Sequence, residues 1–245
     1  MARGPDGRPL KSKTWTWAKL AVLKHALLAF PEAKHFWYLD AHAMVTDFSV
    51  SVTDRFVNEE ALDSIMMRDA PLKLALPATA MKSDMDENEE TYHYGDTTTS
   101  VKTYKHTQPQ NTHLVITQGR TGVNTASFLL TNLDHEGGRE YAHALLDHWR
   151  DPLSRSYQGY RTRETAALGH ILRWHPSFLA RTALVPTTQL APLTPKSLWG
   201  LDTAWEIDEY NRLAYNKEDE SQFVAVLMAC QYGSTQECLE EIISL

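Results

Sequence analysis

A carboxylate and an imidazole follow a short aromatic and apolar run near the start of the chain. Residues 36–39 predict a buried strand, and Asp40 and His42 come directly after it. Residues two apart on an extended segment point the same way, so these two side chains could bind one cation or one phosphate. An open α/β sheet keeps its ligand site at such a strand end. The alternative is structural, because an acidic residue at a strand end also keeps the following loop in water.

Length and composition indicate a folded domain and disfavour nucleic-acid binding. The 245 residues are 42% hydrophobic, which is enough for one sizeable core, and the net charge is −7. The sequence has no dense run of lysine and arginine interleaved with aromatic residues, as a nucleic-acid site would need. It also has no run of about 20 apolar residues, the length that spans a bilayer. We expect a polar tail over residues 1–14 and one domain over residues 15–245.

The spacing of apolar residues predicts helices that alternate with strands. Helices are expected over residues 17–30, 53–68, 139–149 and 162–174. Strands are expected over residues 35–39, 113–117, 127–130, 184–186 and 223–228. Thr53 is the expected N-cap of the second helix, and a turn is expected at 119–122. This alternation is typical of an α/β fold.

Two segments interrupt this pattern. Residues 82–111 are acidic and then threonine-rich, which predicts a solvated insertion or a mobile loop. Residues 192–220 predict a long surface loop that exposes or tucks in Trp199 and Trp205. The two cysteines, Cys230 and Cys238, could pair in an oxidising compartment or pack as thiols, and their spacing does not match a zinc site.

Four segments in order resemble glycosyltransferase family 34, which includes fungal α-galactosyltransferases, mannan α-1,6-mannosyltransferase subunits and plant xyloglucan xylosyltransferases. They are residues 17–31 with 37–43, 116–118 with 122–128, 164–170 with 175–176 and 184–186, and 223–230. All of them lie between residues 15 and 238, which is nearly the whole chain. The Asp-x-His, Trp-His-Pro and Leu-Val-Pro segments fit the fungal mannan-synthesising branch.

The resemblance implies a GT-A-like α/β fold whose N-terminal nucleotide-binding part is missing from this sequence. It implies a retaining transfer from a nucleotide sugar to a glycan acceptor, in a Golgi membrane protein whose catalytic domain lies in the lumen. For the mannan branch we expect α-1,6 transfer of mannose from GDP-mannose to a mannan or N-glycan chain. Two alternatives remain: an α-galactosyltransferase that uses UDP-galactose, and a non-catalytic scaffold subunit that pairs with an active homologous glycosyltransferase.

The resemblance also implies a divalent cation, usually manganese, beside the donor diphosphate. Asp40 matches the first residue of the family's Asp-x-Asp motif, and His42 replaces the second carboxylate. Oxygen ligands suit Mn²⁺ and imidazole is tolerated, and the cation would neutralise the leaving diphosphate. Val226 stands where the family usually has a histidine ligand. The expected ligands are therefore Asp40, His42 and the diphosphate oxygens.

By resemblance, Gln118, Gly122, Asn124 and Ser127 match positions that line the sugar site. Asn124 could bind sugar hydroxyls or could simply stabilise a turn. Ala126 stands where glycine is usual, which restricts close approach of the backbone.

The catalytic position implied by the resemblance is Glu164, in a segment that supplies acidic residues to the reacting centre. Thr165 and Ala166 stand where the family places Gln and Asp. Glu164 could position the sugar or stabilise an oxocarbenium-like transition state. Alternatively, it is a first-turn glutamate that the helix dipole favours.

Overall fold

The structure is a computed structural model that describes most of the chain from residue 17 onward. The described residues are 17–73, 92–94, 97–99, 101–119, 122–134, 137–151, 163–194, 214–216, 218–219, 222–227, 230, 234–243 and 245. The expected polar tail at 1–14 and both Trp199 and Trp205 lie outside these residues. Among the described residues, no helix has the length and apolar character needed to cross a membrane.

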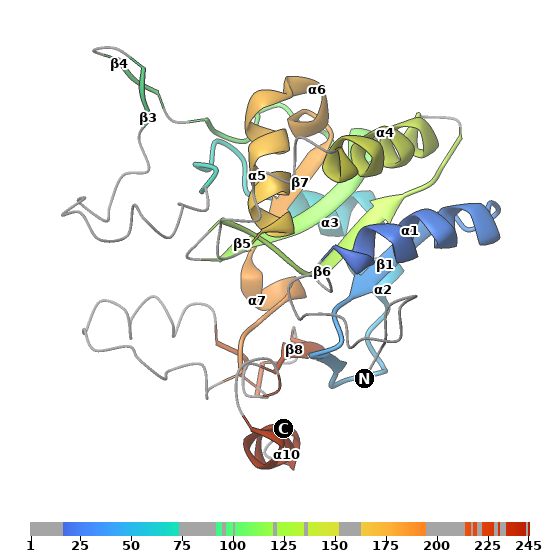
Figure 1. Ribbon diagram of the computed structural model, residues 1–245, viewed down its shortest axis with the longest axis vertical. Helices are drawn as coiled ribbons and strands as arrows, with labels where there is room; N and C mark the ends of the chain where they lie inside the picture. Colours follow the sequence, from blue (N-terminus) through green and yellow to red (C-terminus); the bar gives the residue numbers. More distant parts are fainter. Residues whose placement is uncertain are drawn as a thin grey trace, which may run out of the picture.

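A four-stranded mixed sheet forms the centre of the fold (Figure 1). Its strands are β1 (His35–Leu39), β5 (Leu114–Gly119), β6 (Gly122–Thr131) and β7 (Thr182–Val185), in the order β1-β6-β5-β7. Strand β6 is antiparallel to both β1 and β5, whereas β5 is parallel to β7. The predicted α/β class is confirmed, and the mixed sheet is consistent with a GT-A-like domain.

Alternating side chains of the sheet face two separate cores, as the two-residue period of a strand requires. Leu114, Ile116 and Leu130 pack under the helices α1 (Ala18–Ala29), α4 (Gly138–Arg150) and α5 (Glu164–Trp174). Val115 and Leu129 face the opposite core, which includes residues of α2 (Val52–Phe56), α3 (Glu59–Ile65) and α7 (Thr187–Leu190). Figure 1 shows α1, α4 and α5 gathered along the first face.

The remaining elements are short, except for the C-terminal helix. Strand β2 (Ala43–Val45) pairs antiparallel with β8 (Val224–Val226), and β3 (Tyr92–Tyr94) pairs with β4 (Thr97–Thr99). The 3-10 helix η3 (Pro109–Asn111), α6 (Pro176–Leu179) and α10 (Thr235–Ile243) complete the described elements. A disulfide joins Cys230 to Cys238 of α10 with an S–S distance of 2.01 Å. Of the two alternatives for these cysteines, pairing or packing as free thiols, the structure has the pair.

Two predicted elements differ from the structure in ways that matter for the site. The helix expected over residues 53–68 is two helices, because Ser51 and Asn58 each begin one, with side-chain oxygens that accept from Asp54 N and Ala61 N. A side chain that bonds the backbone in this way competes with continuation of the helix. Strand β6 begins at Gly122, not at residue 127, so Asn124 lies in a strand and not in a turn.

The last part of the expected insertion at 82–111 packs against the domain. The backbone N–H of Leu72 donates to Val101 O at 2.8 Å, and Thr103 N donates to Ala70 O at 2.9 Å. Thr103 itself is buried. Residues 101–111 therefore pack beside the segment that follows α3, and most of the preceding part of the expected insertion lies outside the described residues.

Candidate functional site

Asp40 directly follows β1 and lies beside an irregular stretch of β6. The register of β5 against β6 shifts between Val115 and Thr117, and such bulges re-aim the side chains near them. The backbone N–H of Asp40 donates to Ala126 O at 2.7 Å. The strand end that the sequence predicts is thus fixed to residues of β6 that the family resemblance places at the sugar site.

The carboxylate of Asp40 already has two partners. The hydroxyl of Tyr38 donates to Oδ1 at 2.9 Å, and Nζ of Lys19 lies 3.4 Å from Oδ2. Burial, followed by the negative charge of Asp40, raises the pKa of Tyr38, so the phenol stays protonated and remains a donor. The side chain of Asp40 is 24% exposed, so a ligand can still reach it.

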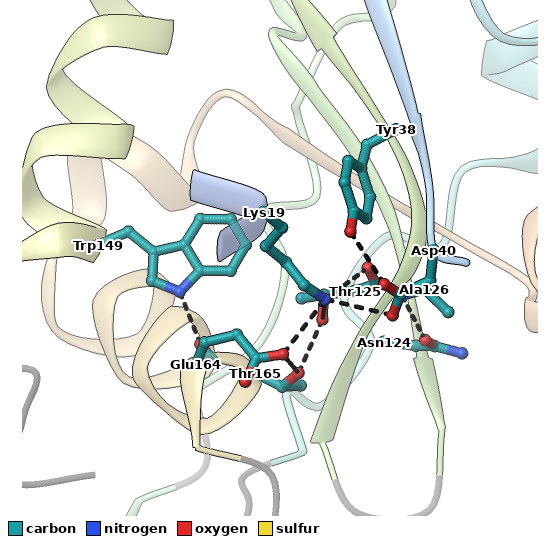
Figure 2. Close-up of polar contacts among 9 residues, drawn as sticks. All are labelled: Lys19, Tyr38, Asp40, Asn124, Thr125, Ala126, Trp149, Glu164 and Thr165. Carbon is teal, nitrogen blue, oxygen red and sulfur yellow. Dashed lines mark hydrogen bonds and ion pairs between the residues drawn. The ribbon is translucent and has the colours of Figure 1, made fainter. Parts of the chain in front are cut away.

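Glu164 is the first residue of α5, and its carboxylate faces the same lysine (Figure 2). Oε1 lies 3.2 Å from Lys19 Nζ, and the side chain is only 6% exposed. Among the residues that the structure describes, Oε2 has no hydrogen-bond partner. Trp149 Nε1 donates to the backbone carbonyl of Glu164 at 2.6 Å, which anchors this end of the helix.

The backbone just before Glu164 is strained. Arg163 has φ 39° and ψ −100°, although residues with a side chain rarely adopt a positive φ. Such strain costs on the order of 1–3 kcal/mol and is concentrated at functional sites. The strained residue thus lies directly before Glu164, the expected catalytic position.

The four expected sugar-site residues have different surroundings. Gly122 has φ 111°, a conformation that suits glycine, and pairs with Gly119 across the hairpin. Asn124 Oδ1 accepts from Ala126 N at 2.9 Å, so the side chain supports the bulge. Gln118 donates to Pro71 O at 2.9 Å and accepts from Lys73 N at 3.0 Å, which ties it to the segment after α3.

Ser127 is the expected sugar-site residue whose placement differs most from the expectation. It is fully buried, and its hydroxyl accepts from Trp37 Nε1 at 3.0 Å. The neighbouring Thr125 faces the carboxylates, because its hydroxyl lies 3.0 Å from Lys19 Nζ and 2.7 Å from the hydroxyl of Thr165. On β6, the side chain that contacts Lys19 is therefore Thr125, whereas Ser127, the expected sugar-site residue, contacts Trp37.

The segment with Val226 lies directly beside the Asp40–His42 turn. Val226 pairs with Ala43, and Leu227 N donates to His42 O at 2.7 Å. The position where the family usually has a histidine is thus next to the expected metal ligands, but valine cannot ligate.

The expected metal site has two protein ligands, Asp40 and His42. In the described ranges, no group of three or more His, Cys, Asp or Glu side chains is arranged to hold a metal ion. Asp40 lies 3.4 Å from the ammonium of Lys19, and we derive no reaction step through a metal. The roles predicted for Asp40 and His42 as metal ligands stay predictions.

Sequence reasoning missed Lys19 as a site residue. A usable signal was present, because Lys19 shares one face of α1 with Leu20, Leu23 and Leu27, all of which are buried. A lysine is almost never fully buried unless it is paired. Its position beside Leu20 and one turn before Leu23, on a predicted core face, therefore indicates a buried partner of opposite charge.

The sequence matches the galactosyl transferase GMA12/MNN10 family over residues 6–237, and the chain belongs to this family. It is 27% identical over 169 residues to an uncharacterized alpha-1,2-galactosyltransferase of Schizosaccharomyces pombe, covering 69% of this chain and 38% of that protein. It is 25% identical over 232 residues to the probable alpha-1,6-mannosyltransferase MNN10 of Saccharomyces cerevisiae, covering 92% of this chain and 48% of that protein.

A second probable alpha-1,6-mannosyltransferase of Saccharomyces cerevisiae, MNN11, is 25% identical over 190 residues, covering 76% of this chain and 38% of that protein. The matched region is thus about two fifths to one half of these curated relatives' length. A solved glycosyltransferase involved in glycosylation of the major capsid of PBCV-1 shares 8% identity and a TM-score of 0.44, over 99% of this chain and 81% of that one. A score this low adds nothing to the fold assignment.

Proposed function

We propose that this chain transfers a hexose, with retention, from a nucleotide sugar to a glycan acceptor. Family membership supports the class of reaction. The observation that carries the proposal is the pair of carboxylates, Asp40 and Glu164, that converge on Lys19. Buried charge of this kind is costly, and it is typical of sites where charge develops during a reaction.

Each carboxylate has a role that follows from its surroundings. Asp40 is partly exposed at the end of β1, where an α/β sheet binds its ligand, so it belongs to the donor side. Glu164 is buried and keeps one oxygen, Oε2, without a partner among the described residues. Its carboxylate can stabilise positive charge that develops at the anomeric carbon, because charge interactions are strongest where water is excluded. The protonated hydroxyl of Tyr38 keeps the Asp40 carboxylate in place.

The proposed donor and acceptor are GDP-mannose and a mannan or N-glycan chain, with an α-1,6 linkage. The similarity to two probable alpha-1,6-mannosyltransferases supports this choice. The alternative is UDP-galactose, supported by the similarity to alpha-1,2-galactosyltransferases. A Mn²⁺ ion held by Asp40, His42 and diphosphate oxygens stays a prediction.

The rival proposal is a non-catalytic subunit that supports an active homologous glycosyltransferase. The observation in its favour is Val226, which lies beside His42 where the family usually has a metal-binding histidine. This rival predicts that the chain copurifies with a second member of the family and binds no nucleotide on its own.

The proposed location is the lumenal side of the Golgi membrane. The disulfide between Cys230 and Cys238 supports an oxidising compartment, because such bonds are rare in the reducing cytosol. Recovery of this bond in protein isolated from its natural host, by mass spectrometry without reduction, would agree with the proposal. Two free thiols in that preparation would argue against it.

Nucleotide binding tests the proposed function against its rivals. Calorimetric titration with GDP and with UDP, each with and without Mn²⁺, compares the natural chain with Asp40→Asn. The control variant is Asp54→Asn, on the exposed side of α2. Binding that is lost in Asp40→Asn and kept in Asp54→Asn supports the donor site, and the preferred nucleotide separates mannose from galactose transfer. Absence of binding in the natural chain favours the non-catalytic subunit.

A further inference from the structure

Lys19 is a buried cation, and the proposed function assigns roles to Asp40 and Glu164 but none to this lysine. It lies in the first turn of α1, and its side chain is 4% exposed. Figure 2 shows its Nζ at the centre of residues from β1, β6 and α5. An ammonium taken out of water at this depth requires compensation by oxygen atoms or negative charge.

The compensation comes from residues that are far apart in the sequence. Nζ lies 3.0 Å from Thr125 Oγ1 and 3.3 Å from Thr125 O. It lies 3.2 Å from Glu164 Oε1 and 3.4 Å from Asp40 Oδ2, and it stands 5.3 Å from the centre of the Tyr38 ring. One ammonium thus contacts two carboxylates, and with both of them ionised the cluster has one negative charge in excess.

We propose that Lys19 is a positioning residue of the transfer reaction, which holds Asp40 and Glu164 at fixed places relative to each other. This inference rests on the proposed function, because it assigns Asp40 to the donor and Glu164 to the sugar. By binding Oε1 of Glu164, the ammonium fixes the position of this buried carboxylate. By contacting Oδ2 of Asp40, the same ammonium also holds the carboxylate that we assign to the nucleotide-sugar donor.

The physical reason for such a residue is that two carboxylates near each other repel. A cation between them removes the repulsion, and its effect is greatest in a site from which water is excluded. A reacting group that is misplaced by about 1 Å can lose about 100-fold in rate. A side chain that holds both carboxylates therefore affects the rate of transfer even though it does not touch the sugar.

The test compares Lys19→Ala with Lys24→Ala. Lys24 lies on the same helix and pairs with Asp147 at the surface, so it controls for the loss of a lysine from α1. We expect kcat per folded molecule to fall about 100-fold in Lys19→Ala, with the KM of the acceptor nearly unchanged, and Lys24→Ala to keep the natural kcat. Propylammonium, which replaces the lost part of the side chain, should restore at least about tenfold of the rate in Lys19→Ala alone.

A second variant keeps the experiment decisive if Lys19→Ala does not fold. Thr125→Val preserves the shape and every charge but removes the hydroxyl that lies 3.0 Å from Nζ. Its kcat should fall at least about threefold, the effect of losing a hydrogen bond worth about 1 kcal/mol.

An unchanged kcat in folded Lys19→Ala, or no rescue by propylammonium, overturns the role of Lys19 while the proposed function stands. A natural chain that transfers no sugar overturns the proposed function instead.

Discussion

Lys19→Met is expected to destabilise the fold far more than Lys24→Met, although both variants remove one lysine and one ion-pair partner from α1. Lys19 pairs with Glu164 and Asp40, whose side chains are 6% and 24% exposed, and Lys19 itself is 4% exposed. Removing one partner of a buried pair costs about 3–5 kcal/mol, because the remaining charge stays buried. Lys24 and Asp147 form a pair at the surface, and such a pair contributes at most about 1 kcal/mol.

The assay is urea unfolding followed by circular dichroism, with a thermal scan beside it. In a domain of this size, a loss of about 3 kcal/mol lowers Tm by about 6–12 °C. The double variant Lys19→Met/Glu164→Gln should recover part of the lost free energy of unfolding, because an uncharged amide replaces the buried carboxylate that has lost its partner. A coupling energy of about 1–3 kcal/mol between the two positions is expected. Equal free energies of unfolding for Lys19→Met and Lys24→Met would contradict the claim that the buried ion pairs of Lys19 stabilise the fold.

Three further outcomes follow from the same structure. Glu164→Gln should lower kcat about 100-fold or more, the cost of losing one stabilising group in the transition state, whereas the control Glu140→Gln, in the first turn of α4, should keep the natural rate. Reduction of the bond between Cys230 and Cys238 should lower the free energy of unfolding by about 2–3 kcal/mol, as measured by urea unfolding with and without dithiothreitol; no change would show that the bond does not stabilise the native state. Burial, and then the charge of a neighbouring lysine, lowers the pKa of His35. Stability should therefore fall as the pH drops through about 6.5, where the unfolded chain takes up the proton first, and His35→Asn should reduce this slope in unfolding curves at pH 7.5 and 5.5.

The sequence predicted the elements whose pattern is local. The apolar run before Asp40 forms β1 with the expected bounds, because a run of aromatic and aliphatic residues favours a buried strand. The helices around residues 18–29 and 138–150 also follow their periodicity. The helix over 53–68 was predicted wrongly as one element, because apolar spacing continued across Asn58 and hid its capping bond.

The contacts of the site could not be predicted in this way. Lys19 and Glu164 lie 145 positions apart in the sequence, and the fold of α1 and α5 on one face of the sheet brings them together. Thr125 contacts Lys19 from a stretch of β6 whose register against β5 is irregular, and no local sequence pattern signals that contact. The resemblance to a family predicted Asp40 and Glu164 as site residues, and in the structure both carboxylates contact Lys19.

The most direct test of the central claim is a transfer assay with isotopically labelled GDP-mannose and a mannoside acceptor, with the anomeric configuration of the product read by NMR. UDP-galactose is run in parallel as the alternative donor. We expect a product with the α configuration of the donor, and a loss of about 100-fold or more in both Asp40→Asn and Glu164→Gln while each variant stays folded. Full transfer by either of these folded variants would contradict the assignment of Asp40 and Glu164 to the reacting site.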